Sequence, residues 1–147
     1  LKSVIRHLRQ RKQNLMLLSY VLNNALGGIA PNFTVDYANA LLSRGSLSKA
    51  LNPTTDLATA GQALFSWDDN SLEGNANATD KAMVLVYNAS KKESMYILDG
   101  AIRTAGSQTV TLPGTYAGDT VELFIAFVSA DGTQVSNSLY LGSGTAA

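Results

Sequence analysis

Cysteine is absent from this 147-residue chain, and histidine occurs once, as His7. The lack of cysteine excludes disulfide bonds, thiolate metal sites and cysteine nucleophiles. His7 lies in a basic stretch, so a histidine metal cluster or a serine triad would need a partner chain. Charged residues are also scarce, at 15% against 46% hydrophobic residues. The chain can therefore bury one core, and its weakly charged surface favours an exported or assembled protein.

No acidic residue precedes Asp36, whereas five of the eleven basic residues do so within the first twelve positions. This head is therefore +5, and the six basic and eleven acidic residues that follow make the remainder −5. Such a head suits an anionic membrane, nucleic acid, a solvated helix face or an acidic neighbouring subunit. Nucleic acid is not favoured, because no aromatic residues interleave with the charges. The basic head consists of Lys2, Arg6, Arg9, Arg11 and Lys12.

Long hydrophobic runs are also missing near the start of the chain. The run LMLLSYVL at residues 15–22 resembles the apolar region of a signal peptide, but Asn23 and Asn24 interrupt it. About 18 to 20 apolar residues are needed to cross a bilayer. The sequence therefore predicts no transmembrane helix.

Apolar residues recur at helical spacing through residues 1–26, which predicts a helix that Gly27 and Gly28 end. The first half has a wide polar face, whereas residues 15–26 are apolar on nearly every side. A helix of that kind must be covered, either by the sandwich of its own chain or by another copy. The residues expected to form this assembly helix are Leu15, Leu18, Val21, Leu22 and Leu26.

From Pro31 onward the sequence consists of short alternating or apolar runs separated by turn residues, which is typical of β-strands. Residues 33–37 and 40–44 are ambiguous between strand and short helix. Because no helical pattern separates the later runs, they predict a mainly β fold built as an antiparallel sandwich. Strands are predicted at residues 61–67, 82–88, 94–99, 108–113, 120–129 and 134–142, with a tight Asp-Gly turn at 130–133.

The chain therefore divides into four parts, of which one is a full domain. The glycine-rich C-terminal tail is expected to be held by a neighbouring molecule. The parts are an N-terminal helical arm at 1–28, a connecting segment at 29–45, a β-sandwich at 46–142 and the tail at 143–147.

Apolar residues on the predicted strands define the core. Tyr87 is expected to join it, whereas Tyr96, Tyr116 and Tyr140 are expected nearer the surface, where they would cover sheet edges, contact subunits or stack on sugar rings. The predicted core residues are Phe65, Trp67, Val84, Val86, Leu123, Ile125 and Phe127.

The stretch DNSLEGNANATD, residues 69–80, matches the ligand spacing of the helix-loop-helix calcium motif, with Gly74 at its glycine position. The motif needs helices on both sides, and here both flanks are predicted strands. A non-helical calcium loop remains one interpretation, because flexible loops of carboxylates and amides suit a hard cation. A plain connection between two strands is the favoured one. The candidate ligands are Asp69, Ser71, Glu73, Asn77 and Asp80.

The order of features from Phe65 onward resembles a fibronectin type III module, an immunoglobulin-like sandwich. Trp67 lies in the second strand, VLVYN in the third, and TVTLP and VELFIAFVSADGTQVSNS follow. That family usually places a tyrosine at the start of the sixth strand, where this chain has Thr120 and Val121, so the tyrosine corner is expected to be absent.

The whole chain is also similar to an uncharacterised domain family of Bacteroidota bacteria. The similarity rests on LSYVLNNA, NFTVDYANALLSRGSL, FSWDDNS, ATDKAMVLVYN and VSNSLYLG, in that order. The resemblance implies a bacterial origin and a helix followed by a sandwich. It brings no assigned activity and no site residues.

These features favour a non-catalytic structural protein that self-associates through its apolar helix. A surface filament, a cell-envelope array or a phage particle would use such a protein, with copies of itself or other shell proteins as partners. Adjacent acids at Asp68 and Asp69 point to opposite faces of a strand end, so they do not form an acid and base pair, and no enzyme is predicted. The alternative is an extracellular sandwich that binds a glycan or protein through its loops, assisted by calcium. No other cofactor is expected.

Overall fold

The computed structural model describes the backbone of residues 26–27 and 34–35 and the whole of residues 41–147. Its regular elements are nine strands and two short 3-10 helices, in the described residues. They are β1 Leu26–Gly27, β2 Thr34–Val35, β3 Leu51–Asp56, β4 Gln62–Asp68, β5 Lys81–Asn88, β6 Glu93–Ile97, η2 Arg103–Ala105, β7 Ser107–Thr111, η3 Gly114–Tyr116, β8 Thr120–Val128 and β9 Leu139–Thr145.

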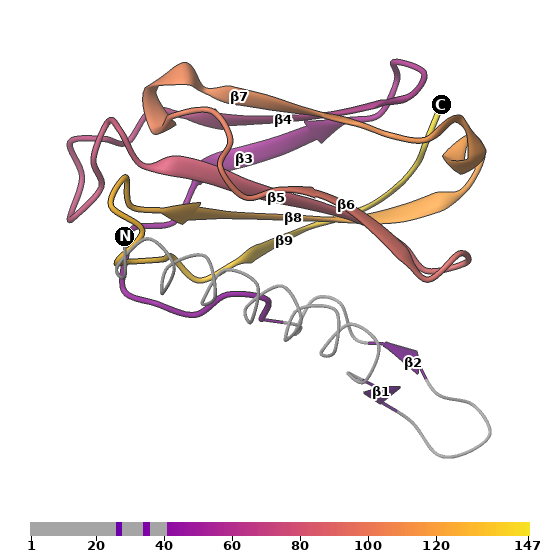
Figure 1. Ribbon diagram of the computed structural model, residues 1–147, viewed down its shortest axis with the longest axis horizontal. Coiled ribbons are helices and arrows are strands. Elements are labelled where there is room, and N and C mark those ends of the chain that lie inside the picture. Colours follow the sequence, from indigo (N-terminus) through magenta and orange to yellow (C-terminus); the bar gives the residue numbers. More distant parts are fainter. Residues whose placement is uncertain (1–25, 28–33, 36–40) are drawn as a thin grey trace, which may run out of the picture.

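The strands from β3 onward form two antiparallel sheets that stack as the two layers of a sandwich (Figure 1). One sheet has the order β3-β4-β7, and the other has the order β6-β5-β8-β9. All pairs within them are antiparallel. The prediction of a mainly β, antiparallel fold is therefore confirmed.

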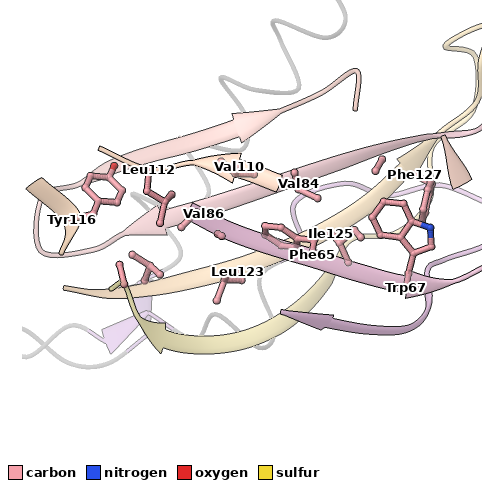
Figure 2. Close-up of a cluster of buried hydrophobic side chains, with 14 of the residues drawn as sticks. Phe65, Trp67, Val84, Val86, Val110, Leu112, Tyr116, Leu123, Ile125 and Phe127 are labelled. Atoms are coloured by element: carbon pink, nitrogen blue, oxygen red, sulfur yellow. The ribbon is translucent and has the colours of Figure 1, made fainter. Parts of the chain in front are cut away.

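The core lies between the two sheets, where alternate residues of each strand point inward. On β4, Phe65 is fully buried, while its neighbour Leu64 faces outward and is 36% exposed. Trp67 packs edge-on against Phe127 at one end of the core, and Tyr116 lies at the opposite end (Figure 2). All seven residues predicted for the core are buried, and Val110, Leu112 and Val121 join them.

Strand β3 has no counterpart among the predicted strands. Its sequence LNPTTD contains Pro53, and Asn52 adopts a positive φ of 45° where the register with β4 shifts. Proline is tolerated in a sheet at an edge strand, and a bulge breaks the period-two pattern on which strand prediction depends. The edge position of β3 in its sheet explains why such a sequence still pairs.

The predicted C-terminal tail is the end of the last strand rather than a separate segment. β9 continues to Thr145, which pairs with Thr120 at the start of β8, and the backbone of Ala146 exchanges bonds with Gly118 and Asp119. Contacts within the chain therefore hold the tail, so its order needs no neighbouring molecule. Its glycines suggest disorder, but they lie within the strand, and Gly142 adopts a positive φ of 94° that favours glycine.

Most of the predicted helical arm, including the basic head, Leu15, Leu18, Val21 and Leu22, lies outside the described residues. Leu26 was expected to be helical, but it lies in β1, which pairs with β2. The ambiguous stretch around Thr34 and Val35 is extended, because β-branched residues favour paired strands. Residues 41–47 then run beside 135–138, where Leu47 N donates to Val135 O.

The core assignment predicts a large difference between two neighbouring substitutions on β4. Phe65→Ala empties a fully enclosed site, so we expect a loss of about 3 to 5 kcal/mol in the free energy of unfolding. Leu64→Ala, on the outward face of the same strand, should cost less than about 1 kcal/mol. Urea denaturation followed by tryptophan fluorescence measures both. Equal losses for the two variants would contradict the arrangement of β4.

Candidate functional site

Arg103 is fully buried, with 0% of its surface exposed, at the start of η2 between β6 and β7. Its backbone N–H donates to Asp80 O at 2.7 Å, and its carbonyl accepts a bond from Trp67 Nε1, also at 2.7 Å. Its Cζ lies 4.0 Å from the centre of the Phe127 ring. Both ends of the residue are therefore fixed at the edge of the core, and the guanidinium stacks on an aromatic face.

The guanidinium is enclosed by oxygen acceptors from two separate segments, residues 48–49 and the loop at 69–80. Nη2 and Nε contact Asp80 Oδ2 at 3.0 and 3.1 Å, which makes a buried ion pair. A buried cation is tolerated only when it is paired and its N–H groups are hydrogen-bonded, and both conditions hold here. The other acceptors are Asn70 Oδ1 at 2.8 Å, Ser48 O at 2.9 Å and Lys49 O at 3.2 Å.

This network ties down both ends of the loop at residues 69–80. Asn70, near its start, and Asp80, at its end, bind the same guanidinium. Asp80 Oδ2 also accepts a bond from Asn77 N, and the Asn70 amide donates to Lys49 O. Further along, Asn75 bonds with Ser48 and with the carbonyl of residue 46. The loop is thus held in one shape although most of its side chains face solvent.

The candidate calcium ligands differ in how far they are buried. Asp80 is buried against Arg103, whereas Asp69, Glu73 and Asn77 are exposed and Ser71 is half-buried. Asp69 Oδ1 accepts a bond from Ser71 N, as in a local side-chain turn. No three carboxylate or histidine groups converge as metal ligands within the described ranges. The loop joins β4 to β5, which agrees with the interpretation favoured from the sequence, and its Asp80 is paired with Arg103. Calcium binding stays a prediction.

The sequence offered one signal for Arg103, which was missed. It is the sole basic residue after Lys92, and it lies among small and apolar residues in the stretch DGAIRTAG. A charge in such surroundings is either exposed or paired in the interior. Its partners lie 23 to 55 positions earlier in the chain, so no local pattern identifies them.

Removing the guanidinium should be far more costly than removing an exposed charge. Arg103→Met leaves the Asp80 carboxylate buried without its partner, so we expect a loss of about 3 to 5 kcal/mol in unfolding free energy. Lys91→Met, which breaks the partly exposed pair with Asp119, should cost less than about 1 kcal/mol. Chemical denaturation measures both values.

A double variant separates the charge from the packing in this prediction. Adding Asp80→Asn to Arg103→Met removes the uncompensated charge, so it should restore part of the lost stability. If Asp80→Asn lowered the unfolding free energy of the Arg103→Met variant as much as it lowers that of the parent chain, the ion pair would not be the dominant interaction.

A second feature is the outer face of the four-stranded sheet, which is apolar like the inner one. Leu85 and Tyr87 on β5 and Phe124 on β8 form a separate hydrophobic cluster, with 5%, 7% and 2% of their surfaces exposed. Leu42 and Tyr140 pack against it, and the Phe124 and Tyr140 rings lie 5.2 Å apart. We call this set of five residues the outer-face cluster.

The polar groups at the outer-face cluster are matched to its apolar surroundings. The Tyr140 hydroxyl donates to Glu122 Oε2, which gives that buried carboxylate a partner. Burial raises the pKa of Tyr87 above its ordinary value, because desolvation disfavours the phenolate. The face therefore behaves as an interior surface rather than a solvated one.

The remaining aromatic residues fall in varied surroundings. Tyr96 is exposed and Tyr140 is half-buried, as expected for tyrosines nearer the surface. Tyr116 was also expected there, but it is 1% exposed, because the turn at η3 carries it into the end of the core. Asp68 accepts a bond from the Asn52 amide, which occupies it at the end of β4.

One apolar side chain is exposed on the loop at residues 69–80, which we call the stapled loop because Arg103 binds residues near both of its ends. Leu72 is 99% exposed at the tip of the segment whose two ends Arg103 holds. A single exposed leucine needs no explanation by itself. Leu72 is unusual because the loop that carries it is held near both ends by Arg103.

These features define the class of protein: a two-sheet antiparallel β-sandwich with one stapled loop and an apolar outer face. Within the described residues, no helix is long and apolar enough to span a membrane. The chain belongs to the family described as "Family of unknown function (DUF6266)", whose model matches residues 7–142. Comparison with curated proteins found no match.

Proposed function

We propose that this protein is a non-catalytic structural protein that assembles with copies of itself through its apolar segment at residues 15–26. The observation that carries the proposal is that the four-stranded sheet is apolar on both faces. An antiparallel sheet in a two-layer sandwich commonly needs one apolar face, and its other face is solvated. The outer-face cluster is therefore an apolar surface that the sandwich alone does not require, and its residues Leu85, Tyr87 and Phe124 are covered within the chain.

The chain itself contains a segment suited to such a surface. Residues 15–26 are apolar on nearly every side, so they too must be covered. Two apolar surfaces in one chain, one on a preceding segment and one on a sheet, support association through mutual burial. The opposite charges of the basic head and the remainder would also draw copies together.

The proposal also covers the organism from which the protein comes and the kind of assembly that it forms. We infer a bacterial origin in Bacteroidota and a place in a surface filament, an envelope array or a phage particle, on the surface of a cell or virion. We also infer that the sandwich is of the fibronectin type III kind. Its three-plus-four strand order supports this, as do the buried Trp67 on its second strand and the buried Tyr116 in the β7–β8 connection.

Assembly through residues 15–26 predicts a mass that depends on concentration. Size exclusion with light scattering should give species heavier than the 15.5 kDa chain at micromolar concentration. Leu18→Asp with Leu22→Asp should return the protein to a monomer, since each buried leucine contributes about 1.5 to 3 kcal/mol.

The matched control for that variant is Ser19→Asp with Asn23→Asp, which adds the same charge on the polar side of the segment. It should leave the mass unchanged. A stable monomer for the parent chain at every concentration would end the assembly proposal.

A second candidate function is an extracellular module that binds a protein or glycan through its loops. The stapled loop favours it, because a rigid loop loses little conformational entropy when Leu72 enters a partner's pocket. Calcium would assist through the exposed Asp69 and Glu73 and the half-buried Ser71 on the same loop.

Calorimetry tests the calcium component. If calcium binds at this loop, titration should release or absorb heat in the parent chain, and Asp69→Ala should abolish the signal. Asp56→Ala, at an exposed acid on β3, is the control and should keep it. Asp80→Ala is less informative, because it also breaks the pair with Arg103. No heat in the parent chain would exclude calcium.

A further inference from the structure

We propose that the outer-face cluster is the seat on which residues 15–26 of the same chain dock in the isolated molecule. Assembly then exchanges this segment between copies. The inference deepens the proposed function, because it names the surface that the apolar segment uses and the state from which assembly starts. It rests on the proposed function only for the exchange step.

The seat has the size and composition of a helix-binding surface. Four of its five residues come from β5, β8 and β9, and neighbouring strands lie about 4.8 Å apart, so the face is roughly 10 Å across. A helix with its side chains is about 10 Å wide, and the eleven residues that precede β1 would make a helix about 17 Å long. Strands β5 and β8, with eight and nine residues, are longer than that. One helix of this length therefore fits along the face.

The chain reaches the seat from the correct side. Leu42 belongs to the outer-face cluster, and its N–H donates to Ser138 Oγ at 2.7 Å, so the connecting segment is fixed at the edge of this surface. Ser43 adds bonds to Ser136 O and from Ser138 N. The seat is thus next to the point where the segment preceding the sandwich joins it.

The β1–β2 hairpin supplies the reversal that the docking needs. Leu26 pairs with Val35 and Gly27 with Thr34, and the two strands are antiparallel (Figure 1). The chain therefore reverses its direction between Leu26 and Val35. From Val35 to Leu42 the chain spans at most about 24 Å, so residues 15–26 can return to the seat within their own molecule. Such tethering gives a high effective concentration.

The same hairpin makes exchange between copies easy. β1 and β2 form a two-stranded sheet of their own and pair with neither sheet of the sandwich. Opening the hairpin would move residues 15–26 to the seat of a second copy with every contact of the seat preserved. Domain swapping of this kind is a low-cost route from a closed monomer to an assembly.

Site-directed cross-linking tests the seat, because the chain contains no cysteine of its own. In the full chain, Leu22→Cys is combined with Met83→Cys, whose side chain lies on the outer face of β5 opposite Ala126. A short bismaleimide is used at low concentration, since a direct disulfide would demand one exact register. We expect at least about five-fold more intramolecular product than for the control.

The control pairs Leu22→Cys with Leu64→Cys, on the outward face of the opposite sheet. A second test pair, Leu18→Cys with Tyr140→Cys, covers the case in which the first pair folds poorly or is out of register. Circular dichroism confirms that each variant is folded before it is cross-linked.

The outcomes separate the seat from the proposed function. Intramolecular product in either test pair supports docking within the chain. Intermolecular product alone would overturn own-chain docking while it supports assembly. Test pairs that react no more than the control would overturn the seat itself. A protein that cross-links within the chain but stays monomeric at every concentration would keep the seat and exclude assembly.

Discussion

The pairing of β5 with β8 is the constraint on which the rest of the molecule depends. These two central strands are apolar along almost their whole length, and they pair in register from Lys81 opposite Val128 to Asn88 opposite Val121. Because successive side chains on a strand point to opposite faces, one set enters the sandwich and the other set faces away. The apolar residues of β5 and β8 therefore form both the core and the outer-face cluster. The strand pairing that stabilises the fold also produces an apolar outer surface that must be covered.

The ion pair of Arg103 with Asp80 organises one end of this sandwich. It connects the segment before β3, the loop between β4 and β5, and the connection before β7, all beside Trp67 and Phe127. A buried pair adds little net stability, since desolvation offsets most of the attraction. Its effect is geometric, because the guanidinium accepts only one arrangement of the acceptors around it. The loop shape, and with it the position of Leu72, follows from that geometry.

The features predicted well from the sequence are those that depend on local repetition. Alternating apolar residues on β4 and continuous apolar runs on β5 and β8 identify strands and core without any knowledge of partners. The features missed depend on context. β3 contains a proline that an edge strand tolerates, and Gly142 in the last strand adopts a positive φ that favours glycine.

The loop at residues 69–80 shows the same division. Its acidic and amide residues match the spacing of a calcium loop, but two residues near its ends, Asn70 and Asp80, bind the guanidinium of Arg103 instead. Residue type and alternation establish a cysteine-free, mainly β chain with one core and an apolar segment that needs a cover. The folded chain alone decides which carboxylate is buried, which arginine it meets and which sheet face is left apolar on the outside. The physical reason is that burial and ion pairing depend on contacts between residues tens of positions apart, which a local pattern does not contain.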